Sequence, residues 1–95
     1  MFWCKTYSAK GQLIVAICDK NLLGKTIGKN PTIIVKKDFY GEEIIDNEKA
    51  LELMKKSKIC NLMGKDVVNL ALKKKFITKE NIMLIDDIPH AQFIK

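Results

Sequence analysis

The chain has 95 residues, 47% of them hydrophobic and 29% charged, which predicts one domain over residues 1–95 with a modest core. Its longest apolar run, Leu13 to Cys18, is far shorter than the roughly 20 residues of a membrane helix, and no signal peptide is recognisable, so we expect a cytoplasmic protein without a membrane partner. The basic residues are 17 lysines and no arginine, against 11 acidic residues. This excess suits a polyanion partner such as RNA and equally a plain solvated surface, and the absence of arginine disfavours base-specific contacts.

The N-terminal residues predict a β-hairpin. Phe2 to Tyr7 and Gln12 to Cys18 are rich in aromatic and β-branched residues, and they flank a turn-forming cluster from Ser8 to Gly11. We expect two antiparallel strands joined by a four-residue loop. Asp19 to Lys25 follows as a short helical or looped crossing, with two leucines as its apolar anchor.

The middle of the chain predicts a third strand and a first helix. Gly28 to Pro31 interrupts the chain, and the β-branched residues of Thr32 to Lys37 favour a strand. Asp38 to Gly41 is predicted to be a turn. Asp46 is a typical N-cap, so we expect a helix from there to about Lys56.

A second helix is predicted to start near Asn61. Its core-facing side is indicated by apolar residues at helical spacing, namely Ile59, Met63, Val67, Leu70 and Ala71. The run from Lys73 to Lys75 suits the negative end of the helix dipole and needs no functional explanation.

The C-terminal residues predict one more strand and an extended tail. Thr78 to Asn81 and the pair Asp86-Asp87 are expected turns on either side of a fourth strand, Ile82 to Ile85. Ile88 to Phe93 is predicted to be extended at an edge or on the surface, because Pro89 lacks a hydrogen-bond donor. The order of elements predicts an α+β domain with a mainly antiparallel sheet of about four strands, covered on one face by two helices.

Aromatic residues beside lysines are candidates for a nucleic-acid surface. Trp3 and Lys5 lie on the same face of the first predicted strand. There the tryptophan could stack on a base of single-stranded RNA and the lysine could neutralise a phosphate. In so small a domain, a role in the core is the alternative for the tryptophan. Phe39 and Tyr40 lie in the predicted turn, next to two lysines, where a surface role is easier to accommodate.

The C-terminal segment carries the only histidine of the chain. If the segment is extended, His90 and Gln92 project to the same side, about 6–7 Å apart. Two hydrogen-bonding groups in this arrangement suit recognition of a polar ligand or the edge of a nucleotide. The alternative is that both side chains are simply solvated.

No group of residues matches a catalytic or metal site. The tripeptide from Gly24 to Thr26 lacks the opening glycine and the long helix of a phosphate-binding loop. Cys4, Cys18 and Cys60 are widely spaced and odd in number, which predicts free, buried thiols and not a disulfide or zinc framework. We therefore expect no catalytic residue, no metal and no cofactor.

Several short motifs together resemble those of one known family. In chain order they are Phe2 to Lys5, Cys18-Asp19 with Leu22 to Lys25, Phe39 to Gly41, Asn61-Leu62 with Gly64, and Pro89 to Gln92. In their order, their spacing and the length of the chain they resemble the archaeal family catalogued as domain of unknown function 424. The resemblance implies a small cytosolic protein without an assigned enzymatic activity, and it supplies no catalytic residues.

The leading hypothesis is a small, basic, non-catalytic binding protein whose partner is RNA or a ribonucleoprotein such as the ribosome. The alternative is a small-molecule-binding or enzymatic domain with a pocket formed by Cys18, Asp19, Lys25, Asn61 and His90. A third possibility is a structural subunit that works only as an oligomer. The distribution of the lysines distinguishes the first two: one basic face favours RNA, whereas an even spread around a deep pocket favours the alternative.

Overall fold

The structure is a computed structural model that describes residues 1–29 and 32–95; Asn30 and Pro31, at the end of the predicted break, lie outside the described residues. Within them, the strands of the main sheet follow the order β5-β1-β2-β6-β8-β7, with bounds β1 Phe2–Ala9, β2 Gln12–Asp19, β5 Glu43–Ile45, β6 Ile59–Met63, β7 Ile82–Ile85 and β8 Ile88–Ile94. Neighbours are antiparallel except β2 and β6, which are parallel. The predicted α+β class with a mainly antiparallel sheet is confirmed; the expected four strands are wrong, because the described residues form six.

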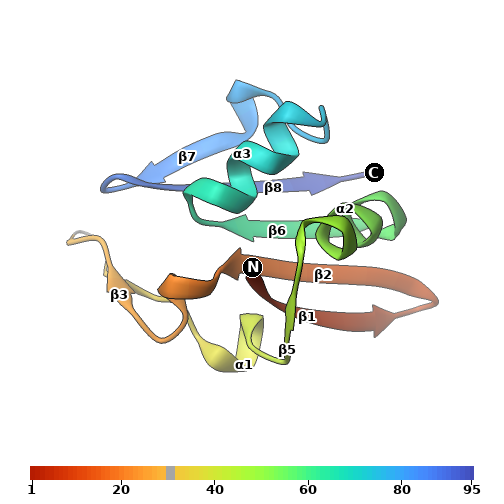
Figure 1. Cartoon of the computed structure of the whole chain (residues 1–95), viewed down its shortest axis with the longest axis horizontal. Coiled ribbons are helices and arrows are strands. Elements are labelled where there is room, and N and C mark those ends of the chain that lie inside the picture. Colours follow the sequence, from red (N-terminus) through yellow and green to blue (C-terminus); the bar gives the residue numbers. More distant parts are fainter. Residues whose placement is uncertain (30–31) are drawn as a thin grey trace.

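Helices pack on both faces of this sheet. Their bounds are α1 Lys37–Tyr40, α2 Asn47–Lys56 and α3 Lys65–Lys73, with short 3₁₀ helices at Lys20–Leu22 and Lys79–Asn81. Figure 1 shows α2 and α3 lying across the strands, whereas α1 lies apart from them beside β1. In the part of the chain that the structure describes, no helix is long and apolar enough to cross a membrane.

Buried side chains form one cluster on each face of the sheet. Because side chains alternate along a strand, Val15 and Ile17 of β2 pack with α2 and α3, while Ala16 and Cys18 pack with Tyr40 of α1. The second, smaller cluster is the one that borders the candidate site described below.

β1 and β2 form the predicted hairpin, with a shorter loop than expected. Ala9 pairs with Gln12, which leaves Lys10 and Gly11 as a two-residue turn. Their φ angles are 53° and 75°, the positive values of a turn whose twist matches that of the strands. The four-residue loop is wrong because Ser8 and Ala9 still belong to the strand.

The predicted third strand does not join the main sheet. Between Thr32 and Lys37 only β4 (Ile33–Ile34) is a strand, and it pairs with β3 (Thr26–Ile27) in a separate two-stranded ribbon. Val35 then buries its side chain in the smaller cluster, while its backbone continues the ribbon through hydrogen bonds with Gly24 and Lys25.

The predicted turn from Asp38 to Gly41 is wrong, because residues 37–40 form the single turn of α1. The backbone N–H of Gly41 donates to the carbonyl of Lys37 at 2.7 Å. This helical turn points Tyr40 toward the sheet, where the ring is buried. Burial of that aromatic surface is the physical reason for a helix where local turn chemistry predicted a loop.

The helix predicted from Asp46 to Lys56 is confirmed as α2. Asp46 Oδ1 accepts a hydrogen bond of 2.8 Å from the backbone N–H of Lys49, which is the expected N-cap. On the exposed side, Lys56 Nζ lies 2.8 Å from Glu52 Oε1.

β6 occupies the place where the second helix was predicted to begin. It lies between β2 and β8, and α3 starts only at Lys65, after Gly64 with a φ of 120°. Ile59, Met63 and Val67 do have helical spacing, but β6 is an inner strand with buried residues on both faces. Such a strand shows no alternation of apolar and polar residues, so periodicity does not separate it from a helix.

β8 is an inner strand, which corrects the prediction that Ile88 to Phe93 lies at an edge or on the surface. It pairs with β6 on one side and with β7 on the other. The carbonyl of Pro89 accepts from the N–H of Gly64 at 2.9 Å, just beyond the end of β6. The proline nitrogen points to that same side, where β6 has ended, so no ladder hydrogen bond is lost.

Candidate functional site

The face of the sheet that carries the smaller cluster, here called the second face, is covered only in part. Its cover consists of α1 and of the residues before it, 20–29 and 32–36, here called the β3–β4 segment. Leu22, Val35 and Tyr40 from this cover are buried against Cys18 and Met63 of the sheet. Beyond these contacts, toward β7 and β8, the cover and the sheet separate.

A pocket of about 430 Å³ lies between the β3–β4 segment, α1 and the sheet. Its walls are mostly apolar and come from Ile33, Ile34, Met63, Met83 and Ile85. Ile34 and Met83, at the opening, are 54% and 58% exposed. Large apolar side chains are seldom this exposed in a cluster unless the surface binds something.

Two aromatic residues form the α1 side of the pocket. The rings of Phe39 and Tyr40 meet edge to face, with centroids 4.8 Å apart and planes at 84°. Tyr40 is buried, and this burial raises the pKa of its hydroxyl well above the ordinary value. Phe39 is partly exposed and is therefore the ring that a ligand can reach.

Residues of β1 hold α1 in this position. The hydroxyl of Tyr7 donates to the carbonyl of Phe39 at 2.7 Å, and Lys5 Nζ donates to the carbonyl of Asp38 at 2.8 Å. These carbonyls belong to the end of a one-turn helix and have no partner within it. Lys5 and Tyr7 thus fix the side of the pocket that carries Phe39.

Three polar side chains complete the pocket: Lys36, Asn61 and His90. Asn61 lies on β6 and His90 on the adjacent β8, and both project to the second face of the sheet. His90 Nδ1 lies 2.9 Å from the carbonyl oxygen of Leu62, which fixes the orientation of the ring. A few oriented polar groups among apolar walls are typical of ligand-binding sites.

The structure brings together four of the residues singled out in the sequence, namely Phe39, Tyr40, Asn61 and His90. Gln92 is opposite Asn61 in the register of β6 and β8, and it is exposed on the same face just outside the pocket. Trp3 is half-buried and packs against the smaller cluster. Its backbone lies within the sheet, paired with Cys18 of β2 and Ile44 of β5.

The remaining candidates do not line the pocket. Cys18 is buried beneath it in the smaller cluster, and Lys25 lies exposed on the β3–β4 segment. Asp19 is buried, and its two carboxylate oxygens accept from the backbone N–H groups of Asp66 and Val67, each at 2.9 Å. Asp19 therefore caps the N-terminus of α3. Of the five residues proposed for a ligand pocket, only Asn61 and His90 share one.

Several residues of the pocket were not identified from the sequence. Ile33, Ile34, Met83 and Ile85 come from β4 and β7, two short apolar strands. Their sequences indicated strands but carried no functional signal. Only the pairing of β7 with β8 and the folding back of β4 place these side chains opposite one another.

No metal site is formed by the described residues. In residues 1–29 and 32–95, no three histidine, cysteine, aspartate or glutamate side chains lie close enough together to hold a metal ion.

The three thiols are free and buried, as predicted. Burial, the largest influence, raises the pKa of Cys4, Cys18 and Cys60 to about 12. Since the thiolate is the reactive form, we expect almost no reaction of the folded protein with Ellman's reagent at pH 8. After unfolding in guanidinium without reductant, all three thiols should react. Rapid modification of one thiol in the folded protein would contradict this prediction.

The lysines are unevenly balanced by acidic residues. Between Asp19 and Asp38 the chain has five lysines and no acidic residue, while the other twelve lysines are accompanied by eleven acidic residues. Nearly all of the net charge of +6 is therefore carried by the β3–β4 segment and the first residue of α1. These are the elements that cover the pocket.

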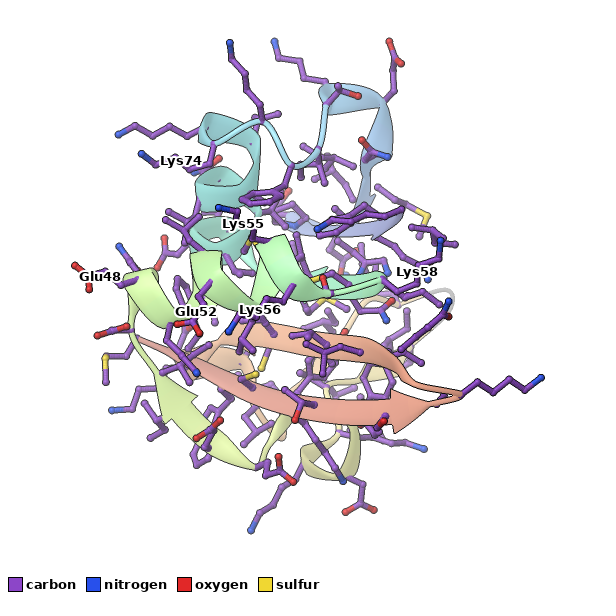
Figure 2. The ribbon with its side chains drawn as sticks, turned by 90° about the vertical axis from the view of Figure 1, so that its right-hand side faces the viewer. Glu48, Glu52, Lys55, Lys56, Lys58 and Lys74 are labelled. Carbon is purple, nitrogen blue, oxygen red and sulfur yellow. The ribbon has the colours of Figure 1, made fainter. Side chains whose placement is uncertain are left out.

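The helix-covered side of the molecule has mixed charge. Figure 2 shows Glu48 and Glu52 along α2 together with Lys55 and Lys56. Glu52 Oε1 lies 2.8 Å from Lys56 Nζ and 3.8 Å from Lys49 Nζ. This side is a solvated surface of alternating charges, unlike the β3–β4 segment.

Comparison with known proteins gives a family and a fold. The sequence matches the family described as "Protein of unknown function (DUF424)" over residues 7–95. No curated protein has a matching sequence. The fold is similar to that in the crystal structure of an uncharacterized conserved protein from Methanopyrus kandleri, with a TM-score of 0.79 and 17% sequence identity, covering 97% of this chain and 89% of that chain.

Proposed function

Because the chain belongs to the family described as "Protein of unknown function (DUF424)", whose description names no activity, we propose a function from the site itself: non-catalytic binding of single-stranded RNA. One unstacked base enters the pocket beside Phe39, and lysines of the β3–β4 segment contact the neighbouring phosphates.

The observation that carries this proposal is the position of the net charge. Five lysines without an acidic residue, four in the β3–β4 segment and one at the start of α1, belong to the elements that cover an apolar, aromatic-lined pocket. Single-stranded RNA has two features that match these: a row of phosphates that lysines can contact, and flat, weakly polar bases that an apolar pocket can hold. Proteins that bind it combine a basic track with aromatic platforms.

The pocket has the size and the chemistry of a base site. Its volume of about 430 Å³ lies within the usual range for small-ligand pockets. The faces of a base would contact Phe39 and the apolar walls, while its polar edge would meet Asn61 and His90. The absence of arginine fits this mode, since a lysine meets a phosphate as a point charge and a pocket can read the base.

The proposal predicts which lysines matter. The double variant Lys25→Gln with Lys36→Gln should weaken binding of a fluorescent single-stranded RNA by about fivefold or more at low salt. It should also flatten the plot of log affinity against log salt by roughly 0.7 for each lost phosphate contact. Fluorescence anisotropy over a series of salt concentrations measures both.

A matched control removes the same charge elsewhere. Lys55 and Lys74 are exposed on the helix-covered side (Figure 2), so Lys55→Gln with Lys74→Gln should change the affinity and the slope much less. Equal weakening by the two double variants would show a non-specific effect of net charge. Absence of binding at low salt would rule out the proposal.

The pocket by itself also supports a second candidate, a free planar small molecule. Such a ligand would depend on Phe39 and His90 but not on Lys25, which lies outside the pocket. Calorimetry with free nucleosides therefore separates the candidates: tight binding that is unaffected by Lys25→Gln favours the small molecule over RNA.

A further inference from the structure

The hydrogen bond of His90 determines which ring nitrogen carries a proton. Nδ1 lies 2.9 Å from the carbonyl oxygen of Leu62. A carbonyl oxygen can only accept, so Nδ1 is the nitrogen that bears hydrogen. In the neutral imidazole, Nε2 is then a hydrogen-bond acceptor.

The acceptor at Nε2 is available to a ligand. Within residues 1–29 and 32–95, neither Nε2 of His90 nor the side-chain amide of Asn61 has a protein partner. The same residues contain no buried side-chain N or O atom that lacks a partner, so both groups are reached by solvent. Both also line the pocket.

The two groups are diagonal neighbours on adjacent strands. His90 is opposite Met63, and Asn61 is opposite Gln92, so Asn61 and His90 share one face, with about 7 Å between their backbone positions. Side chains of this length can converge on one edge of a planar ligand. Together they offer one acceptor of fixed orientation, Nε2 of His90, and one amide donor, the side chain of Asn61.

We propose that the pocket selects a base with an exocyclic amino group beside an unprotonated ring nitrogen, with adenine as its best fit; this rests on the RNA-binding function proposed above. Nε2 of His90 accepts from the amino group, and the amide of Asn61 donates to the ring nitrogen. Uracil places a carbonyl oxygen where the amino group would be, so that two acceptors face each other. Cytosine has the same polar edge as adenine but a smaller apolar face for Phe39 and the methionines.

Binding of short homopolymeric RNAs of equal length tests this selection. Oligo-A should bind about tenfold more tightly than oligo-U at the same salt concentration, the discrimination expected when a pair of hydrogen bonds is gained or lost. Oligo-A with N6,N6-dimethyladenine should bind like oligo-U, because the methyl groups remove both donors. This comparison uses the unaltered protein, so it does not depend on the folding of a variant.

Variants assign the selection to its residue. His90→Phe keeps an aromatic ring but has no acceptor, and it should lower the affinity for oligo-A to that for oligo-U without changing the latter. Gln92→Ala, on the same face but outside the pocket, should leave both affinities unchanged. Thermal melting verifies that each variant is folded.

The outcomes separate this inference from the function on which it rests. Salt-dependent binding with equal affinity for oligo-A and oligo-U would overturn the amino-group selection and leave RNA binding intact. No binding to any oligonucleotide would overturn both. Oligo-C binding as tightly as oligo-A would support recognition of the amino group and overturn the preference for the larger base.

Discussion

Gly64→Ala is expected to lower the free energy of unfolding by about 3 kcal/mol or more. Gly64 has a φ of 120°, which residues with a side chain rarely adopt. A Cβ atom there would lie 2.4 Å from Cγ and 2.5 Å from Oδ2 of Asp19. Neither side can move freely, because Asp19 is held by two hydrogen bonds to α3.

Urea unfolding followed by the fluorescence of Trp3, the only tryptophan, measures this loss. Gly11→Ala is the matched control, since Gly11 also has a positive φ, 75°, but no atom within 4 Å of the added Cβ. The free energy of unfolding of Gly11→Ala should fall by only about 1–2 kcal/mol, the cost of placing a residue with a Cβ atom at a positive φ. Equal losses in the two variants would show that contact with Asp19 contributes nothing.

Asp19→Ala is expected to lower the free energy of unfolding by about 2–4 kcal/mol. The carboxylate accepts two hydrogen bonds of 2.9 Å from the first turn of α3, and the N-cap residue itself, Gly64, has no side chain to replace it. Removing Asp19 leaves these two N–H groups without their partner. It also removes a negative charge from the positive end of the helix dipole.

Asp19→Asn should lose less stability than Asp19→Ala. The oxygen of the asparagine amide can still accept one hydrogen bond from α3. The amide NH₂, however, is a donor and faces the second backbone N–H, which then has no acceptor. Unfolding in urea ranks the three proteins. Equal stability of the alanine and asparagine variants would show that the hydrogen bonds to Asp66 and Val67 do not stabilise the fold.

The protonation of Asp19 also predicts how stability depends on pH. Burial, the largest influence, raises the pKa of Asp19 despite the two hydrogen bonds that lower it. The carboxyl group of Asp19 therefore stays protonated to a higher pH in the folded state than in the unfolded state. From about pH 4 up to the raised pKa, the folded state binds more protons, so the contribution of Asp19 to stability decreases as the pH rises. Asp19→Asn should abolish this part of the pH dependence of unfolding.

A double-mutant cycle joins these two predictions. If Gly64→Ala is unfavourable because its methyl group meets the carboxylate, then the same change in an Asp19→Ala background should cost less. The two losses should therefore sum to more than the loss of the double variant, as is usual for residues in contact. Additive losses would assign the effect of Gly64 to backbone conformation alone.

The local sequence predicted correctly those elements in which neighbouring residues all favour the same secondary structure. The alternation of β1 and β2 around a glycine predicted the hairpin, and Asp46 before an amphipathic run predicted α2, because both signals act over a few residues. From the sequence, Phe39 and Tyr40 were candidates for an RNA surface, and Asn61 and His90 were assigned together to the alternative ligand pocket. The sequence did not indicate that all four line one pocket, since they come from three separate segments.

Tertiary structure decided what local patterns left ambiguous or predicted wrongly. Ile59 to Met63 has helical spacing, yet it is a strand because burial between β2 and β8 on both faces outweighs local propensity. Pro89 disfavours an inner strand, yet β8 accommodates it because β6 ends beside its nitrogen. Asp19 was predicted to form part of a ligand pocket, but in the fold it caps a helix, 47 positions from its partner Asp66. These outcomes depend on contacts between distant parts of the chain, which the order of residues encodes but no local pattern reveals.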